Sequence, residues 1–260
     1  MKQLKFFLLL LIGMIALTTL NSCETENFGN QGDGGKRLVK ITGGGAYYEY
    51  DNLAFHYKDG KLIKIVLGSG YDTEELNFTY TGKIVQINYS EGGMTFQLNN
   101  NGFVESGTDN RDGEFSFEYS NGYLTKFIWK TQDDYFGKIT TNIKYDANGN
   151  LLTASGNRIS GYGDNVSYEH TFTSSNYPLK GKSHFFFHQI YNHNGFGITS
   201  MWPLYYAGLL GKEPTNLVSK IEHKVTYNNG YTDTFDYLFY DDGYVNKITT
   251  EYESMLFTYE

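Results

Sequence analysis

The sequence predicts an all-β fold, an antiparallel meander of roughly 14–17 short strands that curls into a barrel-like sheet. From residue 36 to the end, short runs rich in β-branched and aromatic residues alternate with glycine turns. The chain has 24 tyrosines and 19 phenylalanines but only 3 prolines, and none of the prolines precedes residue 178. Proline is rare in sheets because it cannot donate a ladder hydrogen bond. These observations favour strands along most of the chain.

Turns built around glycine recur at regular intervals. The first four, at Gly60, Gly82, Gly102 and Gly122, lie 22, 20 and 20 residues apart. Such an interval holds one hairpin with two strands of roughly 6–9 residues and a turn at each end. Similar turns follow later in the chain, at Gly149, Gly230 and Gly243.

The side-chain pattern around each turn predicts which residues share a face. A three-residue loop, Ser120-Asn121-Gly122, would pair Tyr119 with Tyr123 and Phe115 with Phe127. One face of that hairpin would then hold Phe115, Phe117, Tyr119, Tyr123, Phe127 and Trp129, and the other Glu118, Lys126 and Lys130. By the same reasoning, one face of the Gly60 hairpin would hold Phe55, Tyr57, Ile63, Ile65 and Leu67. The Gly82 hairpin would have a two-residue Thr81-Gly82 loop, and one of its faces would hold Leu76, Phe78, Tyr80, Val85 and Ile87. One apolar and one polar face is typical of an antiparallel sheet with water on one side.

The stretch 178–214 contains all three prolines and predicts a short helical insertion. Ser183 could cap a first helix, and Pro203 could begin a second helix that ends at Gly211. A wide barrel leaves an interior that its own strands cannot fill. We therefore expect the apolar segment 183–211 to pack against the aromatic face of the sheet and to close one mouth or side of a cavity. The alternative is a helix pair that completes an ordinary core.

The first 22 residues predict a secretory signal peptide. Lys2 and Lys5 precede an apolar run over residues 6–17, which is too short for a membrane span. The run leads into Leu20-Asn21-Ser22-Cys23, which resembles a bacterial lipobox, and Cys23 is the only cysteine of the chain. The resemblance implies cleavage before Cys23 and a diacylglycerol on its sulfur. The alternative is an ordinary signal peptide followed by a chance cysteine.

The predicted organisation is a signal peptide over 1–22, a lipidated Cys23 with a flexible glycine-rich and polar tether over 23–35, and one β domain over 36–260. The formal net charge is −8, and removal of residues 1–22, with two lysines and no acid, makes it −10. No basic field therefore favours nucleic acid as a partner. We expect attachment to the cell envelope through the lipid, at the outer membrane of a Gram-negative bacterium, on either face.

Two stretches carry a family resemblance. Lys36-Arg-Leu-Val-Lys-Ile41 opens the β region, and Tyr205-Tyr-Ala-Gly-Leu-Leu-Gly-Lys stands late in it, with Asn216-Leu-Val just beyond. With the glycine hairpins between them, these segments resemble the secreted lipoproteins of the domain-of-unknown-function 4595 family, which have a porin-like fold. The Tyr-Asp turns also resemble, more weakly, tyrosine–aspartate repeat β-shells. The family has no established activity, so the resemblance implies fold and location and assigns no catalytic residue.

Possible metal sites have simpler explanations. His184 and His188 would share a helix face, with His193 just beyond, but no glutamate partner or third ligand accompanies them. The Asp146-Ala-Asn-Gly-Asn150 run starts like a calcium loop but lacks the glycine and glutamate required further on. A turn explains it better, because Asp, Asn and Gly favour Asx turns. We expect no metal and no cofactor.

No nucleophile elbow, phosphate loop or dinucleotide fingerprint occurs, so we expect a protein that is not an enzyme. The first functional hypothesis is non-catalytic binding of an apolar or glycan ligand. The ligand-binding candidates are Trp202, Tyr205, Tyr206 and Phe186. The second hypothesis is a structural or interaction component of a surface assembly, and the third is a hydrolase. A transmembrane barrel is the alternative architecture, although the apolar runs are shorter than the ~9–11 residues that a spanning strand needs.

Overall fold

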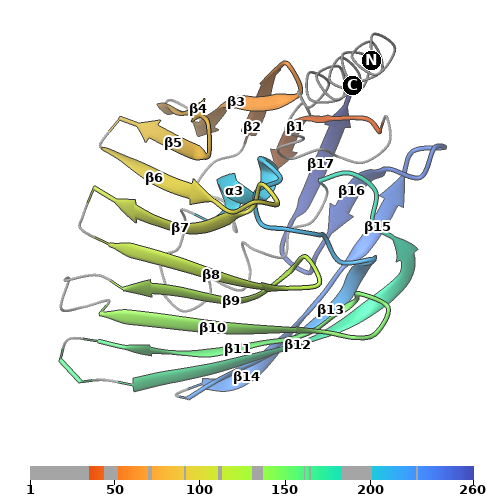
Figure 1. The fold of residues 1–260 in the computed structure, drawn as a ribbon. Coiled ribbons are helices and arrows are strands. Elements are labelled where there is room, and N and C mark those ends of the chain that lie inside the picture. Colours follow the sequence, from red (N-terminus) through yellow and green to blue (C-terminus); the bar gives the residue numbers. More distant parts are fainter. Residues whose placement is uncertain are drawn as a thin grey trace, which may run out of the picture.

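The computed structural model describes residues 35–43, 52–69, 72–90, 92–110, 113–130, 137–160, 162–163, 165–182, 201–226 and 228–260. These residues form 17 strands and one short helix (Figure 1). The first nine strands are β1 (Leu38–Gly43), β2 (Asn52–Lys58), β3 (Lys61–Ser69), β4 (Asp72–Thr81), β5 (Ile84–Tyr89), β6 (Gly92–Leu98), β7 (Val104–Asp109), β8 (Glu114–Ser120) and β9 (Tyr123–Lys130). The remaining elements are β10 (Lys138–Tyr145), β11 (Leu151–Ile159), β12 (Asn165–Pro178), helix α3 (Trp202–Tyr206), β13 (Asn216–Val225), β14 (Asn228–Thr234), β15 (Asp236–Phe239), β16 (Val245–Thr249) and β17 (Ser254–Tyr259).

The strands form a meander that closes almost completely into a barrel. Each strand from β1 to β14 pairs antiparallel with the next, as do β15, β16 and β17. Strands β14 and β15 are separated only by Phe235, whose amide still donates to Ser219 O on β13 at 3.0 Å. Pairing of β1 with β17 joins the two ends of the sheet. The predicted all-β meander is therefore confirmed.

Apolar side chains fill the inside of the barrel and charged ones cover its outside. Phe115, Phe117, Phe127 and Trp129 are buried, and Tyr119 packs against the same core. On the opposite face of that hairpin, Lys126 Nζ lies 2.8 Å from Glu118 Oε1. A similar outward pair joins Lys64 to Glu75 at 2.9 Å across β3 and β4. The predicted inward face is confirmed for Phe115, Phe117, Tyr119, Phe127 and Trp129, whereas the prediction for Tyr123 was wrong, because Leu124 is buried in its place.

The predicted loop of that hairpin was wrong in its length. Asn121 and Gly122 both have positive φ, 52° and 84°, and Ser120 pairs with Tyr123, so the turn has two residues. A bulge then inserts Thr125 into β9. As a result Phe117 pairs with Phe127 and Phe115 with Trp129. The bulge supplies the residue that we had assigned to the loop, and the aromatic side chains therefore still share one face.

A bulge of the same kind in the Gly60 hairpin makes the prediction for Ile63 wrong. Tyr57 pairs with Leu62 and His56 with Lys64, so Ile63 is the extra residue. Leu62 rather than Ile63 is consequently buried in the core. Equivalent extra residues follow three other turns: Glu105, Leu152 and Asn246. In all five hairpins the buried residue before the bulge comes two positions after a glycine with positive φ: Leu62, Val104, Leu124, Leu151 and Val245.

These turns lie at one end of the barrel, which we call the turn rim. Tyrosines close to it donate hydrogen bonds to the backbone of other strands. Tyr80 Oη donates to Leu62 O at 2.9 Å, and Tyr119 Oη donates to Val104 O at 2.8 Å. Three further bonds of this kind run from Tyr57 to Leu38 O, from Tyr237 to Val218 O and from Tyr240 to Phe257 O. The hydroxyls therefore connect strands around the turn rim.

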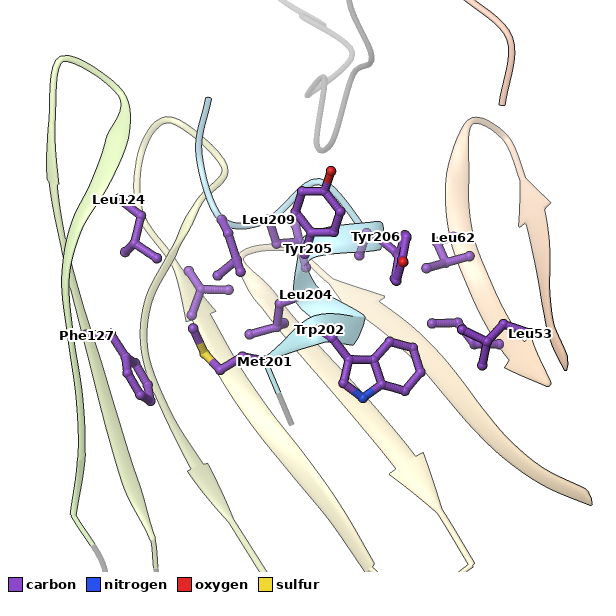
Figure 2. Close-up of a cluster of buried hydrophobic side chains, with 14 of the residues drawn as sticks. Leu53, Leu62, Leu124, Phe127, Met201, Trp202, Leu204, Tyr205, Tyr206 and Leu209 are labelled. Atoms are coloured by element: carbon purple, nitrogen blue, oxygen red, sulfur yellow. The ribbon is translucent and has the colours of Figure 1, made fainter. Parts of the chain in front are cut away.

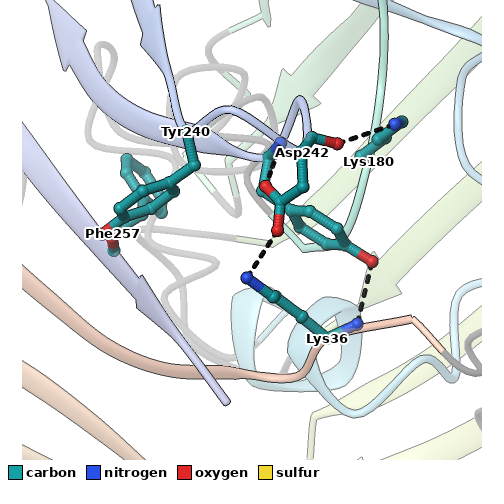
Figure 3. Close-up of polar contacts among 6 residues, drawn as sticks. Lys36, Lys180, Tyr240, Asp242 and Phe257 are labelled. Carbon is teal, nitrogen blue, oxygen red and sulfur yellow. Dashed lines mark hydrogen bonds and ion pairs between the residues drawn. The ribbon is translucent and has the colours of Figure 1, made fainter.

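The two ends of the β region meet at the turn rim (Figure 3). The amides of Arg37 and Glu260 each donate to the other residue's carbonyl at 2.9 Å. The Lys36 amide donates to Tyr244 Oη at 2.8 Å, and the Lys36 ammonium pairs with the Asp242 carboxylate. This ammonium holds the pKa of the Asp242 carboxyl below its usual value. The described chain thus begins beside its own end.

The described part of the insertion lies inside the barrel near the turn rim (Figures 1 and 2). Helix α3 is shorter than predicted, because Gly208 adopts a φ of +74° soon after it and ends the helix. The segment after it is bound to three turn-rim elements: Leu209 O accepts from Val104 N, Lys212 N donates to Gly122 O, and Thr215 N donates to Gly149 O. The predicted packing against the aromatic face is confirmed for this part, and its side chains belong to the core, as the alternative of an ordinary core also requires. Residues 183–200, with the first predicted helix, lie outside the described residues.

Alkaline pH should unfold the protein through its buried tyrosines. Burial raises the pKa of Tyr57, Tyr80, Tyr119, Tyr145 and Tyr237 well above 10. The unfolded chain releases these protons near pH 10 while the folded chain retains them. Stability is therefore complete below pH 10 and falls above it, by about 1.4 kcal/mol per pH unit for each tyrosine.

Urea unfolding between pH 9 and 12, followed by circular dichroism, measures this loss. Tyr119→Phe should reduce the slope of the unfolding free energy against pH by the equivalent of one proton. The control Tyr162→Phe, at a side chain that is 76% exposed, should leave this slope unchanged. Phenolate absorbance that rises fully near pH 10 while the sheet stays folded would contradict the prediction.

Candidate functional site

Three places could carry a function: the α3 region, a buried polar cluster in the barrel wall, and a hollow on the outside. Helix α3 brings the predicted ligand residues together. Trp202, Tyr205 and Tyr206 are 7%, 3% and 4% exposed. The Tyr206 ring lies 4.7 Å from the Phe55 ring of β2, and the Trp202 ring lies 6.0 Å from Tyr206 (Figure 2). These side chains contact the core of the barrel, and Phe186 lies outside the described residues.

A buried ion pair holds the segment around α3 in place. Lys182, which is 6% exposed, pairs with the Glu213 carboxylate. Tyr205 Oη donates to Glu213 Oε2 at 3.0 Å, and Lys182 Nζ lies 5.0 Å from the centre of the Tyr205 ring. Lys182 precedes the insertion's undescribed part and Glu213 follows α3, so this pair connects the two sides of the insertion.

The buried polar cluster consists of inward-facing residues on β12, β13 and β14. His170 and His223 face each other as a cross-strand pair of β12 and β13, with 2.8 Å between their Nδ1 atoms. His223 Nε2 lies 3.1 Å from Asp233 Oδ2 on β14. The exposed fractions of His170, His223 and Asp233 are 0%, 2% and 5%. The Tyr231 ring stacks on His223 with 4.2 Å between ring centroids. We call His170, His223 and Asp233 the buried triad.

Tyr168 lies next to the buried triad on β12. Its hydroxyl bonds to Thr141 Oγ1 and approaches Thr140 O at 3.3 Å. Burial raises the pKa of Tyr168 to about 12, so the phenol stays protonated at neutral pH. Gly156 makes room for it, because a Cβ at that position would lie 2.6 Å from Tyr168 Oη and 1.9 Å from Thr140 O.

The buried triad contains a carboxylate and two imidazoles, which are groups that exchange protons. Nucleophilic catalysis would also require a serine or cysteine bonded to a histidine. The contacts of the two imidazoles described above join them to each other and to Asp233. No group of three or more His, Cys, Asp or Glu in that same part of the chain could hold a metal ion. The contacts of the buried triad link β12, β13 and β14 through polar side chains within the barrel wall.

Sequence reasoning missed the buried triad. The sequence signal that could have indicated it is the alternation of side chains along each strand. His170 shares a strand face with Tyr168 and Phe172, and His223 shares one with Ile221 and Val225, so each histidine belongs to an apolar strand face. That parity indicates burial but does not show that the two strands are neighbours.

The proposed turn at Asp146 is confirmed. Its carboxylate accepts bonds from the amides of Asn148 and Asn150, both at 2.8 Å, and from the Asn150 side chain at 2.9 Å. These hydrogen bonds hold the pKa of Asp146 below its usual value. The other candidates for metal binding, His184, His188 and His193, lie outside the described residues.

A hollow of about 580 Å³ lies on the outer face of β5 to β10. It forms over β7, where the outward side chains are small and Gly107 brings the backbone close to the Phe96 ring beneath. A Cβ on Gly107 would lie 2.3 Å from Phe96 Cδ1. The outward-facing residues that line the hollow are Ile84, Thr95, Gln97, Ser106, Thr108, Glu114, Ser116, Ile128, Lys130 and Lys138.

Comparison with solved structures finds the same architecture in porin-like proteins. One from Bacteroides vulgatus superposes with a TM-score of 0.65 at 17% identity, covering 86% of this chain and 99% of its own. Another, from Bacteroides uniformis, gives a TM-score of 0.59 at 15% identity, covering 86% and 98%. No protein-family model and no curated protein sequence matches the chain.

The chain therefore has the fold of a porin-like β-barrel. Its resemblance to the domain-of-unknown-function 4595 family stays a prediction. Among the described residues, no helix is both long and apolar enough to cross a bilayer.

Disruption of the Lys182–Glu213 pair should loosen the α3 region. Glu213→Gln leaves the Lys182 ammonium without its carboxylate in a largely buried position, and we expect a loss of about 2 kcal/mol of unfolding free energy. Glu118→Gln breaks an exposed pair and should cost at most about 0.5 kcal/mol. The double variant Lys182→Met/Glu213→Gln should cost less than the sum of the single changes. Additive costs in urea unfolding would show that the two side chains are not coupled.

Proposed function

We propose that the protein is a lipid-anchored component of the cell envelope that binds a glycan without catalysing a reaction. The observation that carries this proposal is the polarity of the barrel, with apolar side chains inside and ion pairs outside. A barrel that crosses a membrane needs an apolar band on its outer face. The outer face of the described strands instead suits water.

Such a domain needs a separate attachment to reach a membrane, and the lipid expected on Cys23 supplies one. The described chain begins at the turn rim, so a tether from Cys23 would reach the barrel at the end that α3 closes. The porin-like neighbours come from Bacteroides, which supports an outer-membrane or envelope location.

The outer hollow supports a glycan as the ligand. Its volume of about 580 Å³ lies within the ~300–1,000 Å³ range of ligand sites. Hydroxyl, amide and charged side chains such as Thr108, Gln97 and Glu114 offer donors and acceptors that suit sugar hydroxyls. An apolar ligand would instead lie inside the barrel, against Trp202 and Tyr206, where the protein's own core now packs.

A second candidate function is an interaction component of a surface assembly. The observation that favours it is the close packing of α3 against the sheet, because an interior already filled by the protein's own side chains needs no ligand. In that case the outer face would contact other proteins.

The lipid anchor can be tested at Cys23. The wild-type protein should partition into the detergent phase on Triton X-114 separation, and Cys23→Ser should remain in the membrane fraction only as an uncleaved precursor or be found in the aqueous phase. Mass spectrometry of the mature N-terminus provides the direct measurement. An unmodified Cys23 on a freely soluble mature chain would contradict the proposal.

Glycan binding can be tested by filling the hollow. Ser116→Trp places an indole among its lining residues, and we expect at least a tenfold loss of the binding that wild-type protein shows on a glycan array. Thr79→Trp, on the outer face of β4 away from the lining residues, is the matched control. Loss of binding in Trp202→Ala but not in Ser116→Trp would place the ligand inside the barrel. Co-purification of partner proteins without any bound glycan would favour the assembly function.

A further inference from the structure

The charged side chains of the outer hollow lie at one end of it. Glu114 on β8, Lys130 on β9 and Lys138 on β10 are directly opposite one another across the three strands, and all three are exposed on the outer face. The outward-facing lining residues of β5 to β7 carry no charge: Ile84, Thr95, Gln97, Ser106 and Thr108. The hollow therefore has a charged end and a neutral part.

The two lysines of the charged end form a like-charged pair. Lys130 and Lys138 are cross-strand partners, so their Cβ atoms lie ~4.5–5.5 Å apart. Like charges that are directly opposite one another destabilise a sheet. The other cross-strand partner of Lys138 is Ile159 on β11, which brings no negative charge. The pair can therefore present two ammonium groups to one anion, and an anion between them would offset their repulsion.

No carboxylate among the described residues neutralises this pair. Glu114 is directly opposite Lys130, but neither lysine of the pair forms an ion pair within the described part of the chain. On the same hairpin, by contrast, Lys126 pairs with Glu118 at 2.8 Å. The chain has 29 acidic and only 21 basic residues, so acids are not in short supply. The charge of Lys130 and Lys138 is thus available to a ligand.

The extent of the hollow indicates the size of that ligand. Its lining residues come from six consecutive strands, from Ile84 on β5 to Lys138 on β10. Neighbouring strands lie ~4.8 Å apart, so these two strands are separated by about 24 Å around the barrel wall. A single sugar ring cannot reach from one to the other, whereas a short oligosaccharide can.

We propose that the outer hollow binds an acidic oligosaccharide, with a carboxylate or sulfate group of one sugar held between the ammonium groups of Lys130 and Lys138. This proposal rests on the glycan function proposed above. Neutral sugars of the same oligosaccharide occupy the part over β5 to β7, where Gln97 and Thr108 offer donors and acceptors. The Glu114 carboxylate repels the acidic group, which places that group on the Lys138 side of Lys130.

A glycan array that presents neutral, carboxylated and sulfated oligosaccharides tests the proposal. The strongest signals of the wild-type protein should come from carboxylated or sulfated oligosaccharides. An increase of the NaCl concentration from about 0.05 M to about 0.5 M should weaken these signals about tenfold, because salt screens interactions between exposed charges.

Variants of the charged end give the second readout. The double variant Lys130→Met/Lys138→Met keeps apolar side chains of similar length and should lose at least about tenfold in affinity for the best acidic oligosaccharide. Glu114→Gln removes the repelling charge and should raise that affinity. The matched control is Lys144→Met, because Lys144 is exposed on the same face of β10 but lies nearer the turn rim, outside the lining residues.

Urea unfolding without ligand checks that the double variant is folded. Its stability should not fall below that of the wild-type protein, because the substitutions remove a like-charged pair. If the double variant nevertheless fails to fold, the salt dependence of the wild-type protein and the affinity of Glu114→Gln still decide the question.

The outcomes separate the acidic ligand from the proposed glycan function. Binding that is lost in Ser116→Trp but unchanged in the lysine double variant would leave the glycan site in place and overturn its specificity for acidic sugars. A preference for neutral oligosaccharides would do the same. Acidic oligosaccharides whose binding is insensitive to Ser116→Trp would lie elsewhere and would overturn the proposal. The absence of binding to every oligosaccharide would overturn the glycan function and the acidic ligand together.

Discussion

The bulged glycine turn at the turn rim is the constraint on which the rest of the barrel depends. A glycine with positive φ reverses the chain, the residue two positions later enters the core, and an extra residue follows before regular pairing resumes. A bulge disrupts the ladder locally and increases strand twist. Repetition of the motif therefore does two things at once: it curves the sheet, and it leaves inward side chains three residues apart, as with Leu62 and Ile65.

Tyrosine hydroxyls connect neighbouring strands near two of these turns. Tyr80 and Tyr119 donate to the carbonyls of Leu62 and Val104, which are the buried residues immediately before a bulge. A carbonyl buried without a partner would cost free energy comparable to a lost hydrogen bond. The tyrosine ring also packs against the core, so one side chain provides both apolar contact and a donor.

The distribution of polar and apolar side chains distinguishes the interior of the barrel from its wall. Apolar side chains point inward, so the interior behaves as a core, and α3 with the following segment occupies the end near the turn rim. Among the buried polar side chains of the described residues, an imidazole pair and a carboxylate lie on β12 to β14, where they replace apolar side chains. Buried polar groups of this kind are tolerated when they satisfy one another's hydrogen-bonding groups.

The glycine spacing and the alternation of apolar and polar residues were sufficient to predict a meander with one apolar face, because both are local properties of the chain. Phe115, Phe117, Tyr119, Phe127 and Trp129 were therefore assigned correctly, whereas Tyr123 was placed on the inward face where Leu124 lies. The same reasoning placed an extra residue in the Gly122 loop, although it belongs to a bulge at Thr125. Loop and bulge shift the pairing equally, so the pattern of the residues alone does not separate them.

Long-range contacts were decided only by the tertiary structure. The chain shows that His170 and His223 each lie on an apolar face, yet 53 residues separate them, and only the pairing of β12 with β13 brings their nitrogens to 2.8 Å. The length of α3 and its burial likewise follow from the barrel around it, because Trp202 and Leu204 pack against strands distant in sequence. Local propensity determines which strands and turns form, whereas closure of the sheet determines which faces meet.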